Sequence, residues 1–558
     1  MLSQCLAKET MRTLDYSDKR CLVIEDRRPF LMLLKGLLNS LGATKVTTEM
    51  SAEAGIKACK VKKFDIVVCD LHLGTNRKNG FEFLEEIRTL HLIRPSTVFI
   101  MISGDSARSM VLGSIEKQPD DYLIKPFSQA QLNSRITRAI TRRITLSALY
   151  SQIDHGKYEL STETCRHFLE TEQRYANHLL QILVKLCWKV ENYSEAESIL
   201  EKILAQRQVQ WALCALAKTK LLQHKFEEAI TLAKDAIESF MHNVEAYDII
   251  ADAYLQNNKK PEALKFILEA LSLSPLSIDR HFRVCEIARE NDDFELAMNS
   301  AKSIFELSQR SVHKNVNHLC GYVRSILDVA ENAESKSVRN KFMQESIVAM
   351  HRAKNDESTK TQPDDFDFGI FESIIHARML HLEGKTSDSK KALEESQIEI
   401  ERNFTEYPVA MAADSLKLML DLGDYEEAAK LAAIIKKNPE KVDSSILYLA
   451  QSESAKIQKN RTKYVKHNKL GIELYGQGSY ANAYEEFCHA KKISPLNIGI
   501  TLNLMQSLAK LIKQTEKPEG KHIIEARELF RFINNMPLKS VHKTKFERMR
   551  AEVEDALS

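Results

Sequence analysis

The first 143 residues alternate short apolar runs with longer amphipathic stretches. Four runs have strand composition: Cys21–Ile24, Ile66–Cys69, Val98–Ile102 and Tyr122–Ile124. Strands that alternate with helices favour a parallel sheet covered by helices on both faces. We therefore expect an α/β domain over 18–143 with a doubly wound, five-stranded parallel sheet. Its strands are predicted over 20–25, 45–48, 65–70, 97–102 and 121–124, and its helices over 29–41, 51–62, 80–90, 106–117 and 128–142.

Beyond residue 143 the strand pattern disappears and the chain reads as helical. Ala196, Ala229, Ala263 and Ala297 each follow a similar turn and are separated by 33, 34 and 34 residues. One helix pair cannot bury its own apolar stripe, so pairs of this period are expected to stack into an all-α solenoid. We expect connecting helices over 144–178, repeats over 179–310, irregular helices and a mobile loop over 311–372, and repeats with C-terminal helices over 373–558.

Polar residues follow four of the predicted strands: the pair Glu25-Asp26, Asp70, Ser103 and Lys125. The carboxyl ends of parallel strands meet at one edge of the sheet, so these side chains should converge. Three carboxylates and a lysine would repel or neutralise one another unless a cation and an anionic ligand complete the set. Mg²⁺ suits such oxygen ligands. The pattern therefore predicts that Asp70 carries a phosphoryl group beside Mg²⁺.

Composition excludes several other classes of protein. The formal net charge is +2, from 79 basic and 77 acidic side chains, so no overall field attracts nucleic acid. No apolar run approaches the length of a membrane span. The ten cysteines form no C-x-x-C pair, which favours reduced core residues and a cytoplasmic location.

Downstream of the first domain the sequence has no motif of nucleotide, metalloprotease or hydrolase chemistry, so we do not expect an enzyme. Gly476-Gln477-Gly478 is interpreted as a turn between helices. The seventeen histidines show no spacing that we recognise as metal-binding.

On the residues above, the segment 18–143 resembles the receiver domain of two-component response regulators. The resemblance implies that Asp26 ligates Mg²⁺ directly, that Glu25 acts largely through water, and that Asp70 is both a ligand and the phosphoacceptor. The main-chain carbonyl of His72 would complete the metal site. Such a receiver catalyses only its own phosphorylation and dephosphorylation.

The same resemblance implies the residues that sense the phosphoryl group. Ser103 and Lys125 would bind its oxygens, and the peptide bond before Pro126 would be cis. Tyr122 would be the switch aromatic that turns inward when Ser103 moves to the phosphate. Ser103 stands where threonine is commoner in the family, and the two are chemically equivalent.

The chain departs from the family in the loop after Asp70. Gly80, which opens the next helix, comes ten residues after Asp70. This loop is about two residues longer than usual and lacks the Met-Pro that commonly follows the aspartate. Arg77 and Lys78 either attract an incoming phosphodonor or form a solvated turn.

The helical part of the chain resembles tetratricopeptide arrays over about 180–310 and 375–500. One unit fills the key positions of that repeat: Tyr247, Ile250, Ala251, Tyr254, Ala263, Ile267, Ala270 and Pro275. A second has Leu470, Gly471, Ala483, Phe487, Ala490 and Pro495. The resemblance implies a concave surface that binds a peptide or a protein.

Together these patterns predict a response regulator of a phosphorelay. A histidine kinase or phosphotransfer protein would phosphorylate Asp70, and the helical repeats would bind a protein partner that the sequence does not identify. One alternative is an auxiliary modulator that binds a sensor kinase or another regulator and alters phosphotransfer. Another is a nucleic-acid-binding output, which the absence of a clustered basic recognition helix disfavours.

Overall fold

The structure, a computed structural model, describes residues 14–74, 77–104, 119–240, 243–309, 311–312, 314–355, 366–438, 446, 450, 454–514 and 520–557. The predicted helix over 106–117 lies outside the described residues. The chain divides into two compact units, Met1–Asn291 with Glu306–Lys314 and Asp292–Phe305 with Asn315–Ser558. Each unit is described by itself below.

The first unit begins with the parallel sheet that the sequence predicts. Its five strands have the order β2-β1-β3-β4-β5, and all neighbouring pairs are parallel. The strands are β1 (Arg20–Ile24), β2 (Lys45–Glu49), β3 (Ile66–Asp70), β4 (Val98–Ser103) and β5 (Asp121–Ile124). This order is that of a doubly wound sheet, and it confirms the predicted fold class.

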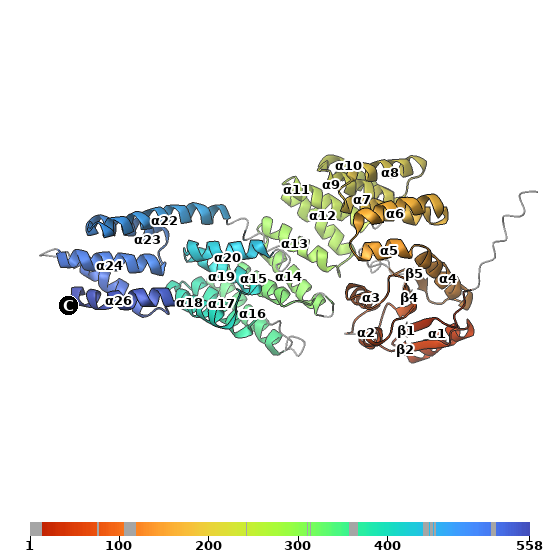
Figure 1. The fold of residues 1–558 in the computed structure, drawn as a ribbon, viewed down its shortest axis with the longest axis horizontal. Coiled ribbons are helices and arrows are strands. Elements are labelled where there is room, and N and C mark those ends of the chain that lie inside the picture. Colours follow the sequence, from red (N-terminus) through yellow and green to blue (C-terminus); the bar gives the residue numbers. More distant parts are fainter. Residues whose placement is uncertain are drawn as a thin grey trace, which may run out of the picture. The chain divides into compact units, whose positions relative to one another are not determined.

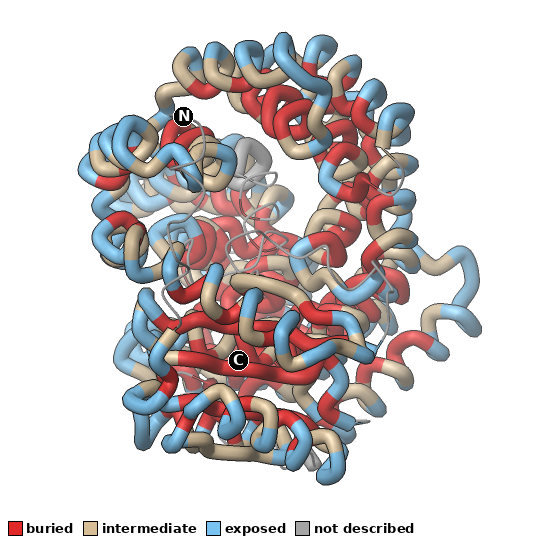
Figure 2. Tube along the Cα trace, turned by 90° about the vertical axis from the view of Figure 1, so that its right-hand side faces the viewer, coloured by how far each residue is buried: buried red, intermediate tan, exposed pale blue. Residues whose placement is uncertain are grey.

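Helices cover both faces of the sheet (Figure 1). They are α1 (Arg28–Ser40), α2 (Ala52–Val61), α3 (Gly80–Thr89) and α4 (Gln129–Thr145). Alternate residues of β1 enter opposite cores: Val23 packs with residues of α1 and α4, and Ile24 with residues of α2 and α3. Figure 2 shows the buried stretches of the chain in red. Two cores, one on each face, therefore hold the strand ends in register.

Helices follow from residue 147 onward. In the first unit they are α5 (Ser147–Asp154), α6 (Tyr158–Thr171), the 3-10 turn η3 (Gln173–Tyr175), α7 (Ala176–Lys189), α8 (Tyr193–Gln206), α9 (Gln210–Leu222), α10 (Phe226–Ser239), α11 (Val244–Gln256), α12 (Lys260–Leu273) and α13 (Ile278–Glu290). Further along the chain come α14 (Phe294–Ser308), α15 (Val316–Glu331), α16 (Lys336–Asn355), α17 (Phe368–Leu382), α18 (Thr386–Asn403), α19 (Val409–Asp421), α20 (Tyr425–Lys437), α22 (Ser454–Gly476), α23 (Tyr480–Ile493), α24 (Ile498–Gln514), α25 (Gly520–Asn534) and α26 (Ser540–Leu557). Helices α15 and α16 lie in the range 311–372, where the sequence analysis expects irregular helices and a mobile loop.

The predicted repeat period is visible in the backbone. Glu191, His224, Asn258 and Asp292 have left-handed φ angles of 57° to 59°, and each lies two residues before the start of a repeat helix. Their spacing of 33, 34 and 34 residues matches that of the predicted alanines. The corresponding turns before α18, α20 and α23 use glycine, including Gly478 in the predicted turn. Ala229 and Ala263 are fully buried, which allows paired helices to approach closely.

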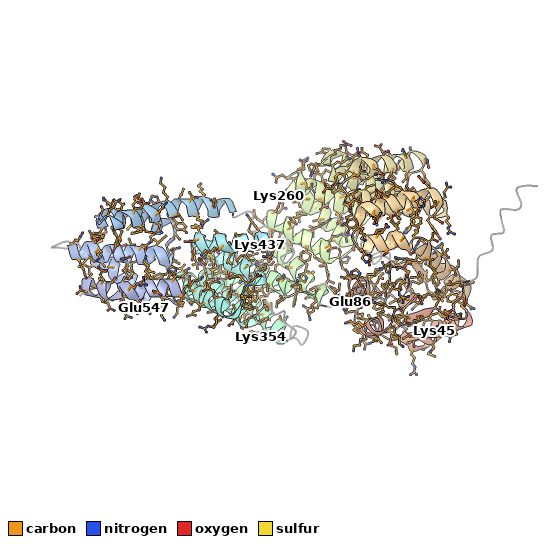
Figure 3. The ribbon with its side chains drawn as sticks, in the orientation of Figure 1. Lys45, Glu86, Lys260, Lys354, Lys437 and Glu547 are labelled. Atoms are coloured by element: carbon orange, nitrogen blue, oxygen red, sulfur yellow. The ribbon has the colours of Figure 1, made fainter. Side chains whose placement is uncertain are left out.

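Charged side chains are spread along the chain, as the labelled examples from Lys45 to Glu547 illustrate (Figure 3). Among the described helices, none combines the length and the apolar character that crossing a bilayer would require.

A buried network joins the sheet domain to the helices that follow it. Asp120, just before β5, accepts a hydrogen bond from Arg143 Nε at 2.7 Å and another from the backbone N–H of Phe99 in β4 at 2.9 Å. The Arg143 guanidinium lies 4.3 Å from the ring centre of Tyr150 in α5. The Tyr150 hydroxyl is 2.7 Å from Nε2 of His178 in α7. We call this set of residues, Asp120, Arg143, Tyr150 and His178, the joint.

The joint predicts a pH dependence of stability. Burial, reinforced by the charges of Arg142 and Arg143, lowers the pKa of His178 to about 4. The unfolded chain binds the additional proton near pH 6.5, so stability falls as the pH drops from about 6.5 towards 4. Between pH 7 and pH 5 the free energy of unfolding of the wild type should fall, in part because of His178. In His178→Gln, which keeps a hydrogen-bonding group, this fall should be smaller by about 1–2 kcal/mol. Urea unfolding of both full chains measures this, and an equal loss in both would contradict it.

Candidate functional site

Four strand ends bring the predicted polar residues together. Glu25 follows β1, Asp70 ends β3, Ser103 ends β4 and Lys125 follows β5. The Lys125 ammonium donates hydrogen bonds to Glu25 Oε2 at 2.8 Å and to Asp70 Oδ2 at 2.9 Å. A single cation therefore bridges two carboxylates that lie 45 residues apart in the sequence.

Asp70 has one oxygen that is not satisfied by the protein. The residue is 6% exposed and Glu25 is fully buried. Asp70 Oδ2 accepts from Lys125, whereas Asp70 Oδ1 is buried and has no hydrogen-bond partner. Because an unpaired buried oxygen is costly, this atom identifies the place where a further positive or hydrogen-bonding group belongs.

The three carboxylates fit a divalent cation at this place. Glu25, Asp26 and Asp70 each offer an oxygen, and these oxygens lie within 4.8 Å of one another. The backbone next to them leaves little room for side chains. A Cβ at Gly80 would lie 2.5 Å from the Asp70 carbonyl oxygen, and Gly74 adopts a φ of +98° beside Asp26. Oxygen ligands from two or three carboxylates with space for water suit Mg²⁺.

The electrostatics of Glu25 support the same interpretation. Burial raises the pKa of Glu25 to about 6, the Lys125 hydrogen bond opposes this shift, and the negative charge of Asp70 adds to it. A buried carboxylate with a raised pKa is stabilised in its charged form when a cation binds beside it.

Lys125 is held in place from two further sides. Its ammonium lies 4.1 Å from the ring centre of Phe30, and this ring packs edge-on against Phe127 at 6.1 Å. The Lys125–Pro126 peptide bond is cis. The backbone N–H of Lys125 donates to the carbonyl of Ser103 at 2.8 Å, which links the ends of β4 and β5.

The other predicted site residues lie near this edge. Ser103 is 7% exposed. Tyr122 packs against the core on the α2 and α3 face, 6.3 Å from Phe81, and its hydroxyl is buried without a hydrogen-bond partner. His72 is exposed. The roles of these three residues stay predictions.

The structure also shows contacts that sequence patterns missed. Phe30 lies against Lys125, and no local pattern marks it because 95 residues separate the two. Lys78 was expected either to attract a phosphodonor or to lie in a solvated turn. Instead it forms an ion pair with Glu86 of α3, and its side chain is 18% exposed.

The contacts of Glu25 generate a test. Since the Lys125 hydrogen bond lowers the pKa of Glu25 and the Asp70 charge raises it, Lys125→Met should raise that pKa above 6 and Asp70→Asn should lower it. Carbon-13 NMR titration of metal-free full chain labelled at glutamate carboxyls measures both shifts, with Glu25→Gln identifying the signal. Shifts of the same sign in the two variants would refute this arrangement.

Comparison with family models gives two matches. Residues 21–137 match the response regulator receiver domain. Residues 145–359 match the ChAPs, described as Chs5p-Arf1p-binding proteins. The first match ends within α4, and the second begins at Thr145, the last residue of α4.

Curated relatives are similar to the N-terminal part of the chain. The alkaline phosphatase synthesis transcriptional regulatory protein PhoP of Bacillus subtilis is 30% identical over 142 residues, which are 25% of this chain and 56% of that protein. The response regulator protein PmrA of Pseudomonas aeruginosa is 32% identical over 161 residues, 28% of this chain and 67% of that protein. A solved receiver domain from Clostridium thermocellum is 25% identical and covers 23% of this chain and 98% of its own, with a TM-score of 0.21.

The sheet order, the acidic edge bridged by a lysine, the matches to the family models and the sequence similarity to PmrA lead to one conclusion: the chain belongs to the response regulators, with an N-terminal receiver domain followed by a helical region similar to the ChAPs.

Proposed function

We propose that this protein is a phosphorylation-controlled regulator whose helical repeats bind a protein partner. Asp70 accepts a phosphoryl group from a histidine kinase or phosphotransfer protein. Glu25, Asp26 and Asp70, with the main-chain carbonyl of His72, hold Mg²⁺. The single observation that carries the proposal is the Lys125 ammonium between Glu25 and Asp70, with Asp70 Oδ1 left unpaired beside them.

The proposed chemical step transfers the phosphoryl group from a histidine of the donor protein to Asp70. An oxygen of the Asp70 carboxylate forms a bond to phosphorus while the phosphorus–nitrogen bond of the donor phosphohistidine breaks. The electron pair of that bond stays on the ring nitrogen, and because the other ring nitrogen of the donor carries a proton, the products are neutral histidine and an aspartyl phosphate. Bound Mg²⁺ supplies positive charge that offsets the phosphoryl oxygens. Lys125 neutralises charge on the opposite side, and attack by water later returns Asp70 and phosphate.

The phosphoryl group would change the charge and the hydrogen bonding at the strand ends. It adds about 1.5 to 2 negative charges and three strong acceptor oxygens. Hydrogen bonds from Ser103 and Lys125 would each contribute about 1.5–3 kcal/mol. If the unphosphorylated receiver populates its active conformation at a ratio of 1:99, a complete reversal of that ratio needs about 5.5 kcal/mol. Because Lys125 already donates hydrogen bonds to two carboxylates, its net gain on binding the phosphoryl group is at the low end of this range.

The output is proposed to be protein binding. The region 145–359 is similar to proteins described as Chs5p-Arf1p-binding, and helical repeats commonly present a surface to a protein. We also propose a cytoplasmic location. In the described part of the chain nine cysteines are free, which suits a reducing compartment.

Phosphorylation of Asp70 can be tested directly. Incubated with acetyl phosphate and Mg²⁺, the wild-type chain should gain the mass of one phosphoryl group, and Asp70→Asn should gain none. Asp26→Asn should slow the reaction by about tenfold or more, since it removes a carboxylate of the metal site. Intact-mass spectrometry over time gives the rates.

Asp65→Asn is the matched control, because Asp65 lies at the opposite end of β3, where it accepts a hydrogen bond from the backbone N–H of Arg20 and forms an ion pair with Arg94. It should be phosphorylated at the wild-type rate. Equal phosphorylation of the Asp70→Asn variant would show that the acceptor is another residue.

A second prediction concerns transmission to the helices. Asp120 at the start of β5 is bonded to β4 and to Arg143, so a change at Ser103 or Lys125 should reach α5. With Mg²⁺ and beryllofluoride as a stable mimic of the phosphoryl group, we expect altered amide hydrogen exchange in 142–154 as well as in 98–125. Exchange measured by mass spectrometry on the full chain gives this result.

Two variants separate transmission from binding. Asp70→Asn should show no change in either segment. Arg143→Ala should keep the change in 98–125 and lose it in 142–154. An unaltered exchange of 142–154 in the wild type, despite a response in 98–125, would refute transmission through the joint.

A further inference from the structure

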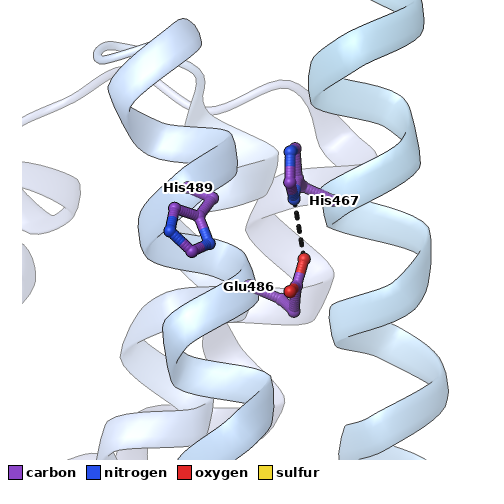
Figure 4. A group of neighbouring side chains, drawn as sticks. All are labelled: His467, Glu486 and His489. Atoms are coloured by element: carbon purple, nitrogen blue, oxygen red, sulfur yellow. Dashed lines mark hydrogen bonds and ion pairs between the residues drawn. The ribbon is translucent and has the colours of Figure 1, made fainter.

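Within the described residues two groups of side chains could hold a metal ion: the three receiver carboxylates, and His467, Glu486 and His489. The second group lies in the second unit, on the helix pair α22 and α23. One ligand atom from each of the three residues falls within 4.8 Å of the others. Figure 4 shows the two imidazole rings and the carboxylate directed to the same space between the helices.

The helix pair brings these residues together by close packing. Glu486 and His489 are three residues apart and share one face of α23. Across from them, Gly471 packs against Phe487 so closely that a Cβ at this glycine would lie 2.7 Å from the ring. His467 is one turn before Gly471, so the same close approach places its ring opposite Glu486 and His489.

The ion pair between His467 and Glu486 does not explain why His489 lies beside them. Nδ1 of His467 lies 2.7 Å from Glu486 Oε2, which satisfies that carboxylate. His489 is exposed, yet its ring centre is 5.3 Å from that of His467. Two imidazoles and one carboxylate at this separation form a ligand set for zinc, three protein ligands with one position open.

We propose that His467, Glu486 and His489 form a binding site for Zn²⁺ that is separate from the receiver's carboxylates. The His467 and Glu486 side chains are 35% and 22% exposed, so the fourth position faces solvent and can take water or a ligand from a protein partner. The bound ion ties α22 to α23 in the region proposed to bind proteins.

The surrounding charge determines which metals the site accepts. Lys463 and Lys466 are exposed on α22, four residues and one residue before His467, and Lys491 and Lys492 lie two and three residues after His489. These ammonium groups repel cations, and the group itself holds one carboxylate. Binding therefore depends on bonds from the imidazole nitrogens, which favour Zn²⁺, and hard ions such as Mg²⁺ and Ca²⁺ are rejected.

The test is calorimetric titration of the full chain with Zn²⁺ in excess Mg²⁺, which keeps the receiver carboxylates occupied. We expect His489→Ala and Glu486→Gln each to weaken binding at one site by at least about tenfold, since loss of an outer-shell partner alone costs about 10–100-fold. His351→Ala is the matched control, because His351 is exposed on α16 and should leave every site unchanged.

A second measurement keeps the result independent of folding defects. Co²⁺ in place of Zn²⁺ should give visible absorption bands of four-coordinate cobalt in the wild type and in His351→Ala, and weaker bands in His489→Ala. Circular dichroism of the metal-free variants reports their helix content. Equal Zn²⁺ binding by wild type, His489→Ala and Glu486→Gln would overturn the proposal, whatever happens at Asp70.

Discussion

The receiver site depends on one ammonium group placed between two buried carboxylates. Two unit charges about 4 Å apart interact by about 4 kcal/mol at an effective dielectric constant of 20. Repulsion of this order between Glu25 and Asp70 is opposed by the attraction of each to Lys125, which lies within 2.9 Å of both. Asp26 brings a third carboxylate, so the set still carries excess negative charge. That excess and the unpaired oxygen of Asp70 are what the proposed divalent cation would compensate.

The strand that presents Lys125 also connects the site to the rest of the first unit. β5 has four residues, a length of about 13 Å, with Lys125 after its end and Asp120 before its start. Burial would raise the pKa of Asp120, but the charges of Arg143 and Arg88 outweigh it and the pKa lies below its usual value. Asp120 is therefore a charged anchor for Arg143, whose helix continues into α5. Ion pairs at both ends of one short strand offer the proposed phosphorylation of Asp70 a physical route to the helical region.

The sequence predicted those parts of the site that follow from local pattern. Glu25, Asp26, Asp70, Ser103 and Lys125 could be predicted because apolar strand runs end directly before them or at them, and parallel strands bring such ends to one edge. The 34-residue period could be predicted because each repeat needs a small residue and a tight turn at a fixed position.

Contacts between distant segments could not be predicted in this way. Helix α4 continues to Thr145, beyond the predicted end at 142, and Arg143 in its last turn is held by Asp120. Nothing in the sequence near Arg143 indicates that partner. The seventeen histidines showed no metal spacing because His467 belongs to a different helix from Glu486 and His489. Packing of α22 on α23 creates that group, and no window of one helix contains it.

The most direct test of the central claim is a crystal structure of the full chain with Mg²⁺ and beryllofluoride. The account predicts beryllofluoride on an Asp70 carboxylate oxygen, a metal ion contacted by Asp26 and Asp70, and Lys125 Nζ moved from the carboxylates to a fluorine atom. A structure in which beryllofluoride binds elsewhere, or in which Lys125 keeps both carboxylate contacts and leaves the fluorines unbound, would contradict it.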